Sequence, residues 1–328
     1  MHFLQTLSAP TIFFSQCIGS KGIASSCKMG SLSIIHGCSM RQELLLSYTV
    51  ISLLLAVVLT FYATSAVAVD IKNQTYITFS QDHVRMLDAE EAIQLTLDSA
   101  SGSGFASSKK FLYGSVSMEI KLIAGDSAGT VTAYYLSSEI NDEFDFEFLG
   151  NVSGQPYLLQ TNVYSNGTSG REHRIRLWFD PAADYHTYSF LWNNYHAVFF
   201  VDSIPIRIFA NNQALGVPYV SRPMRLYVSI WNGDYWATRF GKDKINWNHA
   251  PFVASFRNFK VDACIWKGQD SECSASTSNL WWEQEAHQTL SSEQAFMLSI
   301  VQNNYTDYDY CKDVKRYPTL PAECNHQF

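Results

Sequence analysis

The chain has 328 residues, which fits one large domain or two ordinary ones and excludes only a mini-protein. Hydrophobic residues make up 47% and charged residues 16%, so the chain is too apolar to be disordered and can bury a core. The formal net charge of -7 disfavours a polyanionic partner, and we expect no binding to nucleic acid.

The most apolar segment runs from Leu44 to Ala68 without a charged residue and is long enough to span a bilayer. Arg41 precedes it and small residues close it, which is the pattern of a secretory signal peptide cleaved after Ala68. We therefore predict a signal peptide that begins at Met40 and a secreted protein. A retained membrane anchor is the alternative. Four N-x-S/T sequons follow, at Asn73, Asn151, Asn166 and Asn304.

Between about Val69 and Cys264 the chain consists of short alternating segments that Gly, Asn, Asp and Pro separate. This pattern is typical of an antiparallel β-sandwich, so we predict an all-β domain. The clearest expected strands are 93–97 (IQLTL), 114–122 (GSVSMEIKL), 131–136 (VTAYYL), 188–192 (YSFLW), 197–201 (AVFFV) and 225–231 (RLYVSIW).

The segment Asn141 to Gly150, NDEFDFEFLG, alternates three acids with three phenylalanines. In a strand the acids Glu143, Asp145 and Glu147 lie on one face and the rings on the other. Burial of each ring stabilises the fold by about 1.5–3 kcal/mol, so the rings fix the register of this strand. Three like charges on alternate positions repel one another, which suggests a functional use.

Cleavage of a glycosidic bond requires two carboxyl groups. The Cα atoms of Glu143 and Glu147 should lie about 13 Å apart in a strand, so their side chains must lean together to reach the ~5–5.5 Å of a retaining pair. We predict Glu143 as the nucleophile and Glu147 as the general acid/base with a raised pKa. Asp145 is expected to organise Glu143 by a hydrogen bond and to act through its charge. A solvated strand face and a Ca²⁺ site are the alternatives, although a straight strand suits Ca²⁺ poorly.

Aromatic and polar residues elsewhere can form a sugar-binding surface, because aromatic rings offer flat apolar faces to pyranose rings. The candidate contacts are Gln160, Asn162, Arg171, Glu172, Trp231, Tyr235 and Trp236. Three histidines could suggest a hydrolase triad, but no G-x-S-x-G motif accompanies them, and we interpret them as structural: His173, His186 and His196.

Beyond Cys264 the composition shifts to Ser, Gln, Glu and Trp, and 289–301 can form a short amphipathic helix. We expect this region to be an appendage without its own core. The predicted organisation is an N-terminal extension of doubtful status (1–39), a signal peptide or signal anchor (40–68), a β domain (69–264) and a C-terminal extension (265–328).

Four cysteines follow the predicted signal peptide, and an even number in an exported chain predicts two disulfides. Of the three pairings we favour Cys264 with Cys273 and Cys311 with Cys324, because short loops close at a small entropic cost. A zinc site is the alternative, but no CxxC motif or close Cys/His pair supports it. We expect neither a metal nor a cofactor.

Several segments between Ile71 and Cys324 carry a resemblance to a known family: NDEFDFEFLGN, PYLLQTNVY, GREHRIRLWFDP, HTYSFLWN, FFVDSIPIR, WNGDYWATR, APFVASF and RYPTLPAEC. Together they resemble the xyloglucan endotransglucosylase/hydrolases of plant cell walls, within glycoside hydrolase family 16. The resemblance implies a curved β-jelly-roll, a retaining double displacement on xylose-bearing β-1,4-glucan, and secretion to the apoplast. It implies the same catalytic roles for Glu143, Asp145 and Glu147, and it implies a glycan at Asn151. The substrate contacts that it implies are Gln160, Thr161, Asn162, Gly170, Arg171, Glu172, Tyr235, Trp236 and Arg316.

The chain departs from the family pattern at a few positions. Asn141 stands where members often carry His, and Tyr235 and Phe240 stand where relatives carry acidic or smaller residues. A glycosyl-enzyme can be resolved by water or by the 4-hydroxyl of another sugar chain, with Glu147 as base in both cases. We expect a monomeric xyloglucan endotransglucosylase without stable membrane association, whose donor and acceptor are both xyloglucan. An endohydrolase, a non-catalytic wall carbohydrate-binding protein and a membrane-anchored structural protein are the alternatives.

Overall fold

The computed structural model of the chain describes residues 71–87, 92–268, 273 and 280–326. The predicted signal peptide and the extension before it lie outside these residues. In the part that is described, no helix combines the length and the apolar character that crossing a membrane requires.

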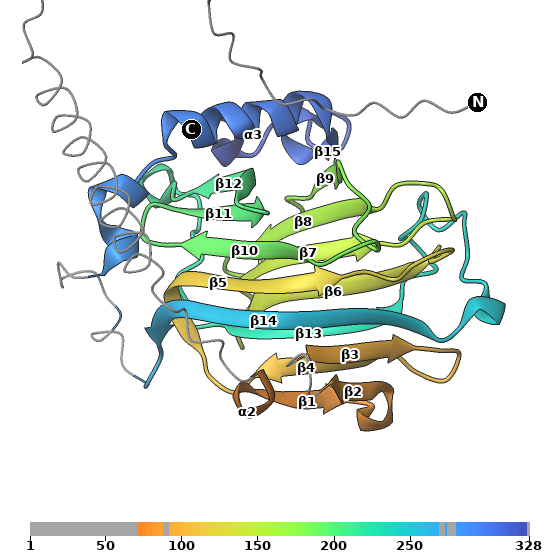
Figure 1. Cartoon of the computed structure of the whole chain (residues 1–328). Helices are drawn as coiled ribbons and strands as arrows, with labels where there is room; N and C mark the ends of the chain where they lie inside the picture. Colours follow the sequence, from red (N-terminus) through yellow and green to blue (C-terminus); the bar gives the residue numbers. More distant parts are fainter. Residues whose placement is uncertain (1–70, 88–91, 269–272, 274–279, 327–328) are drawn as a thin grey trace, which may run out of the picture. The chain divides into compact units, whose positions relative to one another are not determined.

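Two antiparallel sheets dominate the described residues (Figure 1). The first has eight strands in the order β1 (Thr75–Phe79), β4 (Ser103–Ser107), β13 (Arg225–Asn232), β6 (Thr130–Ser137), β7 (Glu143–Leu149), β8 (Leu158–Tyr164), β9 (His173–Arg176) and β15 (Thr306–Asp309). The second has seven strands in the order β12 (Ile204–Ala210), β11 (His196–Val201), β10 (His186–Trp192), β5 (Phe111–Lys121), β14 (Phe252–Ile265), β3 (Ala92–Leu97) and β2 (Val84–Leu87). The predicted all-β sandwich is confirmed. Each of the six expected strands overlaps an observed strand, and their ends differ by at most three residues.

Helices are few among the described residues, and they lie outside the sheets. They are α2 (Ile71–Gln74), α3 (Ser292–Asn304) and short 3₁₀ helices at Gln81–His83, Gln213–Leu215, Trp247–His249, Trp281–Glu283, Glu285–His287, Tyr310–Lys312 and Ala322–Asn325. The helix α3 matches the helix predicted at 289–301. Ser291 caps it by accepting a hydrogen bond from the backbone of Gln294, whose side chain in turn accepts from the Ser291 backbone. Its buried Leu298 packs against the outer side of β11 and β12.

The core lies between the two sheets and is rich in aromatic rings. The three phenylalanines of β7 are fully buried there, which is the packing that the alternation of acids and rings predicts. Their rings contact the inward-facing aromatic residues of β10, with centroid distances of 5.7 Å for Phe144–Trp192, 4.8 Å for Phe146–Phe190 and 4.7 Å for Phe148–Tyr188. The rings therefore fix which face of β7 points outward, away from the second sheet.

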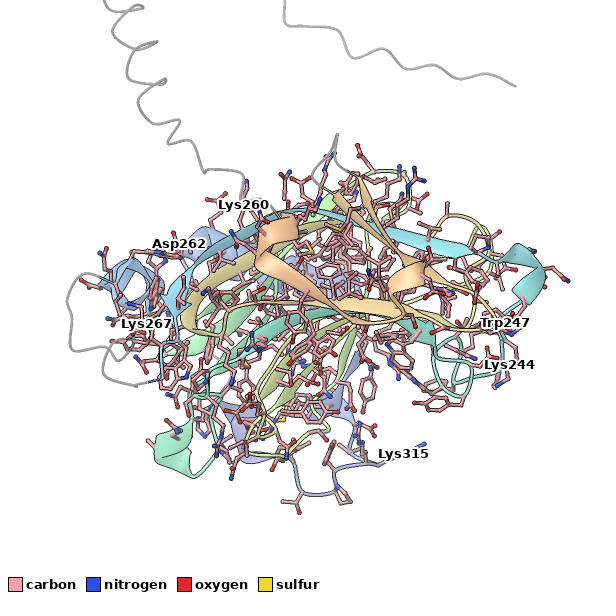
Figure 2. The ribbon with its side chains drawn as sticks, turned by 90° about the horizontal axis from the view of Figure 1, so that it is seen from below. Lys244, Trp247, Lys260, Asp262, Lys267 and Lys315 are labelled. Atoms are coloured by element: carbon pink, nitrogen blue, oxygen red, sulfur yellow. A yellow bond between two sulfur atoms is a disulfide. The ribbon has the colours of Figure 1, made fainter. Side chains whose placement is uncertain are left out.

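The outer surfaces of the two sheets face opposite sides of the domain. In Figure 2, Lys260 and Asp262 of β14 mark the side of the seven-stranded sheet, and Lys315 lies on the other side, where the eight-stranded sheet is exposed. Lys244 and Trp247, between β13 and β14, lie together at one end of the sheets.

The C-terminal extension is part of the sandwich rather than a separate appendage. Its strand β15 pairs with β9 and completes the eight-stranded sheet. Both predicted disulfides, Cys264–Cys273 and Cys311–Cys324, are present, so these four thiols are not zinc ligands. Because the extension supplies an edge strand, residues near the C-terminus reach the same sheet face as the acids of β7.

Candidate active site

Strand pairing places the three acids of β7 in the middle of the eight-stranded sheet. Asp145 lies between Tyr135 of β6 and Asn162 of β8, and Glu147 lies between Ala133 and Gln160. Residues directly opposite each other in antiparallel strands share a face. The outer face therefore carries the acids, and the sequence prediction that they share one side of a strand is confirmed.

Asp145 is buried and interacts closely with Glu143. Burial raises the pKa of Asp145 well above its ordinary value, and the charges of Glu143 and Glu147 and a hydrogen bond with Glu143 raise it further. Burial and the neighbouring charges therefore favour the protonated form of Asp145, in which this side chain can donate to Glu143. This is the hydrogen bond that the sequence analysis expects between Asp145 and Glu143.

Glu147 is held from the neighbouring strand. The Gln160 amide nitrogen Nε2 donates to Glu147 Oε2 at 2.7 Å. Burial raises the pKa of Glu147, and the Gln160 hydrogen bond opposes part of that effect. Glu143 and Glu147 thus have different environments, which is what a nucleophile and a proton donor on one strand require.

The outer face also carries a row of tyrosines that sequence reasoning missed. The rings of Tyr135 and Tyr227 stack with centroids 5.3 Å apart and planes 18° from parallel. Ala106 of β4 pairs with Tyr227 on one side and with Tyr76 of β1 on the other, so Tyr76 continues the row to the sheet edge. Alternation within each strand could have indicated these residues, but their alignment depends on the strand order, which the sequence does not show.

The three predicted contacts on β8 point in two directions. Gln160 and Asn162 share the acid face, and Asn162 Oδ1 accepts a hydrogen bond from the backbone nitrogen of Arg171 at 3.0 Å. Thr161 points toward the core, where its fully buried Oγ1 accepts from Arg207 Nη1 at 3.0 Å. Its side chain therefore does not lie on the face that carries the acids.

The predicted contacts in the loop before β9 join the sheet to the C-terminal extension. Arg171 is buried, and its Nε donates to Glu323 Oε1 at 2.5 Å. Its guanidinium is thus occupied by an internal ion pair. Glu172 and Arg316 form a more exposed ion pair at 2.6 Å on the side of β15.

Gly170 lies directly beneath the extension. It has a φ of +87°, its carbonyl accepts a hydrogen bond from the Tyr317 hydroxyl at 2.6 Å, and an added Cβ would lie 2.5 Å from that hydroxyl oxygen. Both observations explain why glycine is required at this position.

The predicted aromatic contacts lie at the end of β13. The centroid of Trp236 is 6.1 Å from that of Trp231 and 6.4 Å from that of Tyr235. Tyr235 is 75% exposed, whereas both tryptophans are half-buried and pack against the buried cluster of Val131, Leu149 and Ala237. Tyr235 is therefore the ring of this group that is most available to a ligand.

A cavity of about 380 Å³ lies between the segment 237–240 and β15, and it is lined by Arg174, Phe240 and Tyr308 among others. Asn151, just beyond β7, lies on its rim, and the Asn151 amide donates to the Pro156 carbonyl at 2.9 Å. The sequon at Asn151 is thus adjacent to the end of the acid strand.

Two carboxyl groups on one exposed sheet face are what the cleavage of a glycosidic bond requires. The sequence model of glycosyl hydrolases family 16 matches residues 71–249, and that of the xyloglucan endo-transglycosylase C-terminus matches 276–324. The chain belongs to glycosyl hydrolases family 16 and, within it, to the xyloglucan endotransglucosylase/hydrolases.

Two curated relatives illustrate the similarity. The "Probable xyloglucan endotransglucosylase/hydrolase protein 5" of Arabidopsis thaliana is 50% identical over 250 residues, which are 75% of this chain and 85% of that protein. The "Xyloglucan endotransglucosylase protein 2" of Diospyros kaki is 50% identical over 75% of this chain and 84% of its own length. Among solved structures, a Bacillus licheniformis β-glucanase is similar with a TM-score of 0.47 and 22% identity, over 56% of this chain and 89% of that one.

Proposed function

We propose that this chain is a xyloglucan endotransglucosylase that cuts the β-1,4-glucan backbone of one xyloglucan chain and joins the fragment to another. The observation that carries the proposal is that the two glutamates of β7 have different hydrogen-bond partners: Asp145 for Glu143, and Gln160 of β8 for Glu147. Its relatives named for this activity support the choice of xyloglucan as the substrate.

In the first step, a Glu143 carboxylate oxygen attacks the anomeric carbon while the glycosidic bond breaks. Protonated Glu147 gives its proton to the leaving 4-oxygen, and burial favours that protonated form. Asp145 donates to Glu143 and holds the attacking carboxylate in place. In the second step, Glu147 removes the proton of an acceptor 4-hydroxyl, which attacks the anomeric carbon and releases Glu143.

The sugar chain lies across the strands in this proposal. The stacked tyrosines on β6 and β13 extend from the acids toward β1, and Tyr235 with Trp231 and Trp236 lies at the end of β13. On the other side of the acids, the Glu172–Arg316 pair offers polar groups to sugar hydroxyls. The buried side chains of Thr161 and Arg171 act indirectly, by fixing β8 and the C-terminal extension.

The proposed site of action is the cell wall, outside the cell. The signal peptide predicted at 40–68 and the two disulfides support this, because disulfides persist in oxidising compartments. We further propose a monomer without stable membrane association and with a glycan on Asn151.

The experiment is incubation of the purified protein with long xyloglucan and a labelled xyloglucan oligosaccharide. A transferase incorporates label into polymer. An endohydrolase, the second candidate, accumulates reducing ends without incorporation. Glu143→Ala separates an enzyme from a non-catalytic binder, since an enzyme variant loses turnover by orders of magnitude yet still binds glucan.

A further inference from the structure

The segment after β13 places an exposed phenylalanine in an unusual backbone conformation. Phe240 is 76% exposed and has a φ of +61°, and the preceding Arg239 has a φ of +47°. Non-glycine residues seldom adopt this left-handed region, and such strain often accompanies functional sites.

The Phe240 ring contacts a cation on the acid-bearing sheet. The guanidinium carbon of Arg174 lies 4.9 Å from the Phe240 ring centroid and 5.8 Å from that of Tyr308. These distances are those of cation–π contacts. Arg174, a half-buried residue of β9, is thus restrained by two rings from two different segments of the chain.

Arg174 in turn determines how the Gln160 amide is oriented. Arg174 Nε donates to Gln160 Oε1 at 2.8 Å, and Gln160 Nε2 donates to Glu147 Oε2 at 2.7 Å. An arginine has no acceptor atom, so the amide oxygen must face Arg174 and the NH₂ group must face Glu147. If Arg174 moved, nothing in this chain of contacts would prevent the amide from rotating.

We propose that Phe240 is a positioning residue for the acid/base, because it holds Arg174 where Arg174 keeps the Gln160 amide nitrogen directed at Glu147. This inference rests on the proposed function, since it takes Glu147 to be the proton donor. In this proposal Phe240 acts on Glu147 through Arg174 and Gln160, which is a different role from direct contact with sugar.

The consequence for pH dependence follows from the groups that face Glu147. They are Glu143 and Asp145 on β7, Tyr164 on β8, Arg174 on β9 and Glu172 in the loop before β9. The Gln160 hydrogen bond and the Arg174 charge favour the Glu147 carboxylate, whereas burial and the nearby acids favour its protonated form. Loss of the ordered amide should therefore let Glu147 keep its proton to a higher pH.

The experiment compares Phe240→Gly with the wild type. Glycine suits the left-handed backbone, so the variant should fold with an unchanged or higher Tm. We expect kcat for transfer to fall about three- to tenfold. In the pH profile of kcat/KM for the donor, the alkaline limb should move to higher pH by about several tenths of a unit. Phe240→Tyr, which keeps the ring, should retain the wild-type profile.

Two further variants serve as comparisons. Phe296→Ala removes an exposed phenylalanine of α3 and should leave kinetics unchanged. Arg174→Lys keeps the charge but loses the planar Nε donor, and it should shift the alkaline limb in the same direction as Phe240→Gly. The double variant should shift it no further, because both changes break one chain of contacts.

An unchanged kcat and pH profile in Phe240→Gly, with only a higher KM, would overturn the proposal and leave Phe240 as a sugar contact. Additive shifts in the double variant would overturn it as well. Failure of the underlying function has a different signature, because wild-type protein would then show neither transfer nor hydrolysis at any pH.

Discussion

If Asp145 acts as a protonated donor to Glu143, two substitutions at this position should have different effects on activity. Asp145→Asn keeps an NH₂ donor beside Glu143 but cannot ionise, whereas Asp145→Ala removes the donor. A hydrogen bond to a charged group contributes about 1.5–3 kcal/mol, and each 1.36 kcal/mol corresponds to tenfold in rate. We therefore expect kcat/KM to fall about 10- to 150-fold in Asp145→Ala and by less than about tenfold in Asp145→Asn.

The assay is initial-rate transfer to a labelled acceptor across a range of donor concentrations and pH, with thermal unfolding as the control for folding. Asp145 is only 6% exposed and its strand is fixed by buried rings, so neither variant should unfold the domain. If Asp145→Asn lost as much activity as Asp145→Ala, the negative charge of Asp145 would be the required feature, and Asp145 would not act as a protonated donor.

Three further predictions concern stability. Phe146→Ala leaves a cavity between β7 and β10 and should lower the free energy of unfolding by about 3–5 kcal/mol in urea titrations. Arg171→Met leaves the Glu323 carboxylate buried without its partner and should cost about 3–5 kcal/mol, and adding Glu323→Gln should recover part of that loss. Burial lowers the pKa of His196 to about 4, so the unfolded chain binds a proton that the folded protein does not. The free energy of unfolding should therefore fall as pH drops from about 6.5 to about 4, and a His196→Gln variant should show a shallower decline in the same titration.

The fold and the acid strand could be predicted from the sequence because their signals are local. Alternation of acids and phenylalanines over 143–149 specifies a two-faced strand, and this strand is observed with its three rings fully buried. The disulfide pairing also followed from short separations along the chain, 9 residues for one bridge and 13 for the other. Period-two alternation also indicates that Thr161, a contact implied only by the resemblance, faces the side opposite Gln160 and Asn162.

Contacts between distant segments could not be predicted in this way. The tyrosine row requires that β6, β13, β4 and β1 be neighbours, and no local pattern encodes that order. The internal ion pair of Arg171 requires knowledge of where Glu323 packs, 152 positions later in the chain. In the sequence, a buried charged residue such as Arg171 looks the same as a charged residue on the surface. Only the assembled sheet distinguishes the two.

The two edges of the eight-stranded sheet are β1 and β15, which come from opposite ends of the described chain. Because synthesis runs from the N-terminus, the acid strand β7 is made more than 150 residues before β15, the strand that pairs with β9. A nascent chain therefore carries the three acids well before the surface around them is finished. Catalytic competence should consequently appear only after β15 has paired with β9.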